Sequence, residues 1–191
     1  MTEPTRLTII LGSAREGRYC DTVFRWVLAE IGSSTDFVVD VIDPASLDLG
    51  SLGRGNGGES VAALRQRIDE ADAFLVVTPE YNHGYPAALK AVIDSAYIEW
   101  QAKPVAFISY GGISGGLRAV EQLRLVFAEL HAVTLRDSVS FPIPWRRFGA
   151  NGLADAHEER KALDMLLARL LWWSHTLRSA RLAAPYAEVA A

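Results

Sequence analysis

The sequence "LTIILGSAREGRYCDT", residues 7–22, joins an apolar run to the start of a segment with helical spacing. The run ends at Gly12-Ser13, and a turn that contains Arg15 and Arg18 follows. An unbroken apolar run of this length predicts a buried strand. Free backbone N–H groups and the helix dipole favour an anion at the start of a helix. The stretch therefore predicts a strand, a turn and a helix, with a candidate anion site at the turn.

The same alternation continues along the chain. Strands are predicted at residues 7–12, 37–42, 73–79, 104–110 and 132–141, and helices at residues 21–31, 60–71, 87–100, 116–130 and 153–182. Strands that alternate with helices predict an α/β fold whose parallel sheet is covered by helices on both faces. Two strand orders are common for five such units. In the order 2-1-3-4-5, the loops after strands one, three and four lie side by side, where ligands bind in such folds.

Composition limits the class of protein. The chain has 191 residues, of which 50% are hydrophobic, and this predicts one domain over residues 1–191. By composition, residues 51–60 are expected to form a flexible loop and residues 183–191 a frayed tail. A net charge of −4 argues against a nucleic-acid binder. The lone Cys20 requires no oxidising compartment, and no signal peptide or membrane-spanning run is evident. We therefore expect a cytoplasmic protein without a membrane segment.

Three loops carry the candidate site. Loop one is the turn described above, loop two lies in "TPEYNHGYPAALKAVID" (78–94) and loop three in "SYGGISGGLRAVEQLR" (109–124). Loop two offers polar groups suited to the edge of a flat heterocycle, and the glycine pairs of loop three allow the backbone to approach a ring closely. Simpler interpretations exist for each loop: a surface turn capped by Asp21 or Thr22, a solvated His83, a packed Tyr81, and a flexible glycine turn.

Together, these segments resemble one known family, the NADPH-dependent FMN reductases of the flavodoxin-like superfamily. "GSAREGR" is similar to that family's GSxRxGR phosphate loop, and "PEYNHGYPAALKAVID" and "GGISGGLRAVEQLR" are similar to two further segments of the family, in the same order and spacing. The resemblance covers residues 7–142. It implies a flavodoxin-like three-layer α/β sandwich with a five-stranded parallel sheet in the order 2-1-3-4-5.

The resemblance also implies the residues that hold FMN. Around the phosphate it places Ser13, Arg15, Arg18, Cys20, Asp21 and Thr22; along the isoalloxazine Pro79, Glu80, Tyr81, Asn82 and His83; and on its other side Tyr110, Gly111, Gly112 and Ser114. Asp21 departs from the family pattern, because a carboxylate near a phosphate repels it. We therefore expect Asp21 to contribute only its backbone N–H, unless its side chain caps the helix.

The implied reaction needs no catalytic side chain. No catalytic triad, CxxC, HExxH or metal-ligand spacing is evident, and a flavin supplies hydride chemistry by itself. We expect NADPH or NADH to reduce bound FMN, and an acceptor such as free flavin or a quinone to take two electrons in a second step; azo dyes and metal oxyanions also suit an open flavin. Backbone N–H groups at residues 82–84 are expected to stabilise the reduced ring. Arg15, Arg18 and the Arg146-Arg147 pair are candidates for a 2′-phosphate, although residues 145–147 also fit a solvated loop.

Other functions and the assembly state stay open. A flavodoxin-type electron carrier or a non-catalytic flavin-binding protein is the alternative, whereas a response-regulator receiver lacks the carboxylates it needs after strands one and three. The aromatic "AYIEW" (96–100) and the resemblance predict a homodimer or homotetramer. Met165, Leu166, Leu170, Trp172 and Trp173 are expected to lie in the core or in a subunit contact.

Overall fold

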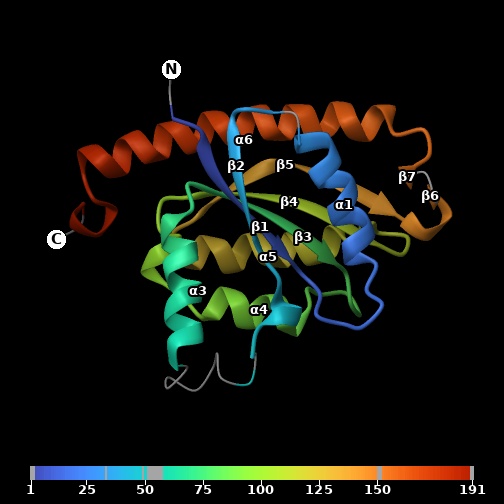
Figure 1. Ribbon diagram of the computed structural model, residues 1–191, viewed down its shortest axis with the longest axis horizontal. Coiled ribbons are helices and arrows are strands. Elements are labelled where there is room, and N and C mark those ends of the chain that lie inside the picture. The colour runs from blue at the N-terminus through green and yellow to red at the C-terminus, as the bar shows by residue number, and fades with distance from the viewer. Residues whose placement is uncertain (1–2, 33, 49, 51–57, 150–151, 190–191) are drawn as a thin grey trace.

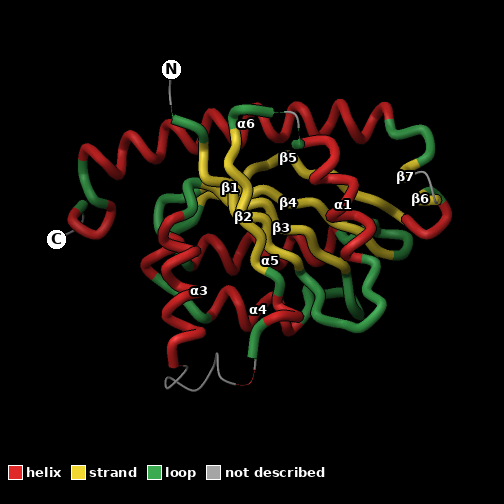
Figure 2. The backbone as a smooth tube through the Cα atoms, viewed as in Figure 1, coloured by secondary structure: helices red, strands yellow, loops and turns green. Residues whose placement is uncertain are grey.

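A computed structural model of the chain describes residues 3–32, 34–48, 50, 58–149 and 152–189. Its strands are β1 (Thr5–Leu11), β2 (Phe37–Ile42), β3 (Ala73–Pro79), β4 (Pro104–Gly111) and β5 (Val133–Pro142), and its main helices are α1 (Cys20–Ile31), α3 (Gly58–Glu70), α4 (Ala87–Asp94), α5 (Leu117–Glu129) and α6 (His157–Ala183). The strands form one parallel sheet in the order β2-β1-β3-β4-β5 between two layers of helices (Figures 1 and 2). The predicted flavodoxin-like three-layer sandwich and its strand order are confirmed.

Each face of the sheet carries its own core. Along β1, Leu7, Ile9 and Leu11 pack toward α1 and α6, whereas Ile10 packs with the helices α3, α4 and α5 on the opposite face (Figure 1). Alternate residues of a strand point to opposite faces, so a strand covered on both sides must be apolar throughout. This is why the central strands appear in the sequence as unbroken apolar runs.

The helix predicted over residues 87–100 is wrong in its second half. The α-helix α4 ends at Asp94, and a 3-10 helix, η2 (Ile98–Trp100), follows after Tyr97 leaves the helical conformation. The indole ring of Trp100 is fully buried and lies 4.5 Å from the ring of Phe74, and its N–H donates to the carbonyl of Ile93 at 3.0 Å. The chain must turn toward the core after α4 to bury this large ring against Phe74 of β3, and a continued helix would not make that turn.

The start of the closing helix is also wrong. Residues 153–156 of the predicted helix do not belong to it, because β6 (Phe148–Gly149) pairs antiparallel with β7 (Gly152–Leu153) before α6 begins at His157. Gly152 and Asp155 have positive φ angles of 91° and 50°, which interrupt a right-handed helix. Of the apolar residues expected on α6, Leu166 and Leu170 are buried in the core, whereas Met165 and Trp172 are exposed.

Two predicted loops remain to be placed. Residues 51–57 of the expected flexible loop lie outside the described residues, and α3 begins directly after them. After α6, residues 186–188 form a short 3-10 helix. The hydroxyl of its first residue, Tyr186, lies 2.9 Å from Nδ1 of His131, which follows α5. Within the ranges described here, no helix has both the length and the apolar character needed to cross a membrane.

Candidate functional site

The three predicted loops meet at the carboxyl ends of their strands. Loop one (residues 12–19) follows β1, loop two (residues 80–86) follows β3 and loop three (residues 112–116) follows β4. The hydroxyl groups of Ser13 in loop one and Tyr81 in loop two lie 2.7 Å apart. The hydroxyl of Ser114 in loop three donates to Glu80 in loop two at 2.6 Å. The strand order therefore brings these separate segments into direct contact, as the sequence predicted.

Loop one delivers an open helix start. The strand leaves no room for a side chain at position 12, because a Cβ on Gly12 would lie 2.8 Å from the Cα of Thr78. Helix α1 begins at Cys20, and its N-cap residue, Tyr19, makes no side-chain capping bond. The expectation that Asp21 or Thr22 caps this helix is therefore wrong. In the first turn of α1 the Thr22 N–H already donates to the Tyr19 carbonyl at 3.1 Å, whereas the N–H groups of Cys20 and Asp21 have no acceptor among the residues described; free N–H groups at a helix start are what an anion binds.

Arg18 holds loop one in place. Its side chain is only 8% exposed, and its guanidinium donates to both carboxylate oxygens of Asp43, at 2.5 and 2.6 Å, and to Asp21 at 2.8 Å. It also donates to the carbonyl of Ser13. The hydrogen bonds from Arg18 lower the pKa of Asp43 below its usual range. The charge of Arg18 is thus balanced by two carboxylates, which distinguishes it from a free phosphate ligand.

Arg15, by contrast, has no carboxylate partner in the described part of the chain. Its guanidinium carbon lies 3.6 Å from the centroid of the Tyr81 ring, in a cation–π contact. The Ser13 hydroxyl beneath is fully buried, and it accepts the N–H of Arg15 at 3.3 Å while it contacts Tyr81. Arg15 is therefore an exposed cation beside the open start of α1.

Loop two ends in a tight turn. Tyr81 and Gly84 exchange backbone hydrogen bonds of 2.9 and 3.1 Å, and the two residues between them, Asn82 and His83, have positive φ angles of 49° and 77°. Positive φ at both central positions defines a type I′ turn. The Gly84 N–H donates to Tyr81, so the expectation that it faces a ligand is wrong. The N–H groups of Asn82 and His83 have no acceptor among the residues described.

Loop three is fastened to loop two through a carboxylate. Glu80, with a side chain 7% exposed, accepts from Ser114, from the backbone N–H of Arg118 at 3.2 Å and from the Arg118 guanidinium at 3.0 Å. Burial alone would raise the pKa of Glu80, but these donors outweigh it and lower the pKa below its usual range. Glu80 therefore links loop two to loop three as a carboxylate that accepts hydrogen bonds from Ser114 and Arg118.

The glycines of loop three differ in their roles. Gly116 has a φ of +90°, and a Cβ there would lie 2.8 Å from both the Ser109 Cβ and the Tyr110 backbone nitrogen, so this position requires glycine. A Cβ on Gly111 would meet the nitrogen of Gly116 at 3.2 Å. No atom lies within 4 Å of a Cβ built on Gly112, which is exposed at the edge of the site.

Some predicted site residues point into the protein. Cys20 is buried and its thiol contacts the carbonyl of Val77 at 3.5 Å; burial raises the pKa of this thiol. The ring of Tyr110 lies 6.3 Å from the Tyr19 ring in the core, and the residue is 4% exposed. Burial raises the pKa of Tyr110 as well. In this structure these residues offer a ligand only their backbone atoms.

Sequence reasoning missed several residues that support the site. Asp43, directly after β2, holds Arg18, and Gln122 on α5 donates to the carbonyl of His83 at 2.8 Å. Ile143 has a φ of +48°, rare for a β-branched residue, and its N–H donates to the carbonyls of Gly111 and Gly112 at 2.8 and 3.2 Å. Only Asp43 carried a local signal, because an Asp before a Pro commonly starts a turn.

The two arginines after β5, Arg146 and Arg147, differ in their ion pairing. Arg147 lies 2.5 Å from Glu159 on α6, and this contact raises the pKa of Arg147. Arg146 is exposed and pairs with no carboxylate in the described ranges. The neighbouring Trp145 is 55% exposed, and its ring meets that of Tyr19, at the start of α1, at 6.4 Å.

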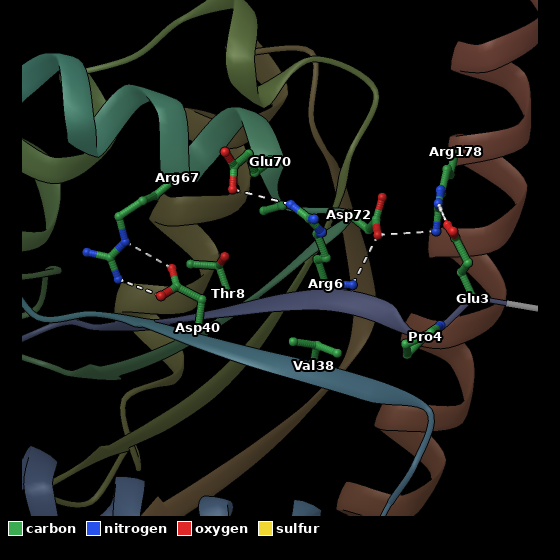
Figure 3. A pocket seen from close by; sticks show the side chains of 11 residues that line it. Glu3, Pro4, Arg6, Thr8, Val38, Asp40, Arg67, Glu70, Asp72 and Arg178 are labelled. Carbon is green, nitrogen blue, oxygen red and sulfur yellow. Dashed lines mark hydrogen bonds and ion pairs between the residues drawn. The ribbon is translucent and has the colours of Figure 1, made fainter.

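A second region lies at the opposite end of the sheet. Here a hollow of about 680 Å³, termed the amino-end hollow, opens beside the first residues of β1 and β2 (Figure 3). Its arginines are all paired: Arg6 with Glu70 at 3.3 Å, Arg67 with Asp40 at 2.8 Å, and Arg178 with Glu3 at 2.5 Å and with Asp72 at 3.6 Å. None of the residues predicted for the FMN site lines this hollow.

Comparison with known proteins agrees with this architecture. The fold is that of flavodoxin-like proteins: a flavoenzyme NAD(P)H:(acceptor) oxidoreductase from Paracoccus denitrificans superposes with a TM-score of 0.73 at 22% identity, over 90% of this chain and 98% of that one. The family model for NADPH-dependent FMN reductases matches residues 5–145. The chain therefore belongs to the NADPH-dependent FMN reductase family, whose members are oxidoreductases that use FMN and NAD(P)H.

Two curated relatives show how far the sequence similarity extends. An NAD(P)H-dependent FMN reductase of Schizosaccharomyces pombe is 38% identical over 122 residues, which cover 58% of this chain and only 60% of the yeast protein. A 2-hydroxy-1,4-benzoquinone reductase from a Burkholderia species is 31% identical over 176 residues, 88% of this chain and 95% of that protein.

Proposed function

We propose that this chain binds FMN across loops one, two and three and acts as an NAD(P)H-dependent reductase of a small aromatic acceptor. The observation that carries this proposal is the start of α1 without a side-chain cap at Tyr19, four residues after an exposed Arg15 that pairs with no carboxylate among the described residues. A phosphate dianion would receive the N–H groups of the first turn of α1 and the charge of Arg15. Arg18 positions this loop through Asp43 rather than contacting the phosphate itself.

The other two loops fit a flat ring. The N–H groups of Asn82 and His83 in the turn of loop two have no acceptor among the described residues and would be available to the polar edge of such a ring, and the open space at Gly112 would let the ring approach the backbone. FMN, when bound, would accept a hydride from NAD(P)H and pass two electrons to an acceptor. The chain's own part is to bind, to orient and to donate hydrogen bonds, and we propose that no side chain acts as a general acid. Since one relative is named as an FMN reductase and another as a benzoquinone reductase, free flavin and quinones are the acceptors we favour.

Arg146 is our candidate for recognition of the 2′-phosphate of NADPH. Arg18 and Arg147 are balanced by carboxylates, whereas Arg146 is exposed and unpaired beside Trp145. Replacement of Arg146 by Ala is expected to raise KM for NADPH about 10-fold with little change for NADH, since one charge-assisted contact is lost. Arg136→Ala, at an arginine 95% exposed on β5, is the matched control. An equal change with both nucleotides would contradict this role.

We further propose a homo-oligomer. Tyr97 and Ile98, in the predicted contact segment after α4, are 52% and 62% exposed. Neighbouring apolar side chains of this size are costly to leave in water. Light scattering at micromolar concentration measures the mass directly, and a monomer would contradict the proposal.

The decisive experiment on function is a spectral titration. Purified protein is mixed with FMN, freed of unbound flavin, and titrated with NADPH without oxygen. We expect the visible flavin absorbance to remain with the protein and then to bleach with one equivalent of NADPH. A bound flavin that NADPH leaves oxidised would favour an electron carrier, and a protein without bound flavin would overturn the proposal.

A further inference from the structure

We propose that the Ser13–Arg15–Tyr81 contact closes the phosphate end of the site in the flavin-free protein, and that FMN must open it to bind. This inference rests on the proposed function, and it adds how access to that site is controlled. The contact spans loops one and two, and Tyr81 reaches both other residues: its hydroxyl lies 2.7 Å from the Ser13 hydroxyl, and its ring carries the Arg15 guanidinium at 3.6 Å.

The burial of Ser13 is the first step of the argument. Its side chain has no exposed surface, and its hydroxyl is occupied on two sides, by the Tyr81 hydroxyl and by the N–H of Arg15. No phosphate can reach a hydroxyl that is fully covered. A contact between Ser13 and a phosphate therefore requires Tyr81 to move away.

Arg15 is the second step. Its guanidinium has no carboxylate partner in the part of the chain described, and it lies on the Tyr81 ring instead. Cation–π contacts at exposed sites are weak compared with a guanidinium–phosphate pair. A phosphate therefore competes well with the Tyr81 ring for Arg15. The Arg15 guanidinium becomes available to the phosphate when the contact opens.

The backbone of loop two lets this motion stay local. Tyr81 is the first residue of the type I′ turn, which is fixed by the reciprocal bonds with Gly84 and by the bond from Gln122 to His83. The backbone is held, while the polar and cation–π contacts of the Tyr81 side chain among the described residues are those with Ser13 and Arg15. Rotation of this side chain opens the site without rearrangement of the turn.

Tyr81→Phe tests the contact, because it removes the hydroxyl and keeps the ring. In flavin-free protein we expect the backbone amides of residues 14–18 to exchange hydrogen about 3- to 10-fold faster than in the wild type, as the loss of one hydrogen bond implies. FMN binding, followed by quenching of flavin fluorescence, should tighten by a similar factor. Tyr186→Phe is the matched control, since it removes one tyrosine hydroxyl contact far from the site.

The outcomes separate this inference from the proposed function. Unchanged exchange in Tyr81→Phe would show that the contact does not restrain loop one, and weaker FMN binding would show that the hydroxyl serves the flavin; either result overturns the inference while the function stands. Ser13→Ala removes both the closing hydrogen bond and the hydroxyl that the phosphate would gain, so amide exchange in loop one should rise as in Tyr81→Phe, whereas FMN binding should be weaker than in Tyr81→Phe. A wild-type protein that binds no FMN overturns the proposed function, and the exchange measurement still tests the closing contact.

Discussion

The two ends of the central sheet differ in how their charges are balanced. In the amino-end hollow, each arginine that lines the cavity faces a carboxylate within 4 Å (Figure 3). At the carboxyl ends of β1, β3 and β4, the start of α1 is uncapped and Arg15 rests on an aromatic ring. The hollow is a defined cavity, but each of its arginine side chains is already paired with a carboxylate of the same chain.

This difference shows which property marks a binding site in this molecule. Exposed ion pairs that satisfy one another give little reason for a ligand to bind, since the ligand would have to break them. Unmatched donors at a helix start offer a ligand interactions that the protein itself leaves unmade. The function proposed above therefore places the ligand at the end of the sheet with unmatched donors and not in the 680 Å³ hollow.

The largest effect is expected from the glycine turn of loop three. Gly116→Ala forces a Cβ against the backbone of Tyr110 at a φ of +90°. Backbone strain and overpacking together are expected to lower the free energy of unfolding by about 2–5 kcal/mol and to abolish FMN binding. Urea unfolding and flavin fluorescence measure the two effects.

Gly112→Ala is the control for that loop. Its Cβ meets no atom within 4 Å, and its φ is not positive, so we expect a change of stability below about 0.5 kcal/mol. Equal losses in the two variants would show that loop three is not held by the geometry of Gly116.

A direct test of the comparison replaces one arginine at each end. Arg18→Met removes the bidentate partner of Asp43, which keeps only the Ala45 N–H at 2.8 Å, and the side-chain donor of the Ser13 carbonyl; because the Arg18 side chain is only 8% exposed, the change should cost about 2–4 kcal/mol. Arg67→Met removes a pair with Asp40 whose side chains are 37% and 48% exposed, together with a hydrogen bond to the Val41 carbonyl at 2.5 Å, and should cost about 1 kcal/mol. Chemical unfolding of both variants at neutral pH measures the difference. If Arg67→Met costs as much, the amino-end hollow is a structural centre and the contrast is wrong.

A further expected effect, close in size to that of Arg18→Met, is a pH dependence beside the amino-end hollow. Burial lowers the pKa of Lys103 to about 8, from a usual 10.5, although its ammonium group donates to the carbonyls of Ile68 and Asp69 at 2.9 and 2.6 Å. Between these two pH values the unfolded chain holds more protons at this position than the folded one, so the Lys103 contribution to stability rises with pH. The expected rise is roughly 2–3 kcal/mol.

Lys103→Met isolates this contribution. The difference in unfolding free energy between wild type and variant should grow in favour of the wild type from pH 8 to pH 10.5. Other groups titrate in that range, including Cys20, whose raised pKa acts with the opposite sign, but they are common to both proteins. A difference that stays constant with pH would show that Lys103 remains charged in the folded state.

The sequence predicted those parts of the fold that depend on local properties. The bounds predicted for residues 37–42 and 73–79 agree with β2 and β3: β3 is buried along its whole length and is a continuous apolar run, whereas β2, at the edge of the sheet, alternates between half-buried and exposed residues. The predicted end of α4 and start of α6 were wrong, since the burial of Trp100 and the antiparallel pairing of β6 with β7 depend on what the neighbouring elements leave uncovered.

The sequence alone therefore determined the alternation of strands and helices and the three glycine-containing loops, because apolar runs and turn residues act over a few positions. Only the tertiary structure decided which polar side chains bind other residues of the chain and which are available to a ligand. Arg18 meets Asp43 from 25 positions away, and Ser13 meets Tyr81 from 68 positions away, because the strand order sets their loops side by side. A residue type reveals that a group can donate or carry charge, whereas its availability to a ligand depends on partners that only the folded chain supplies.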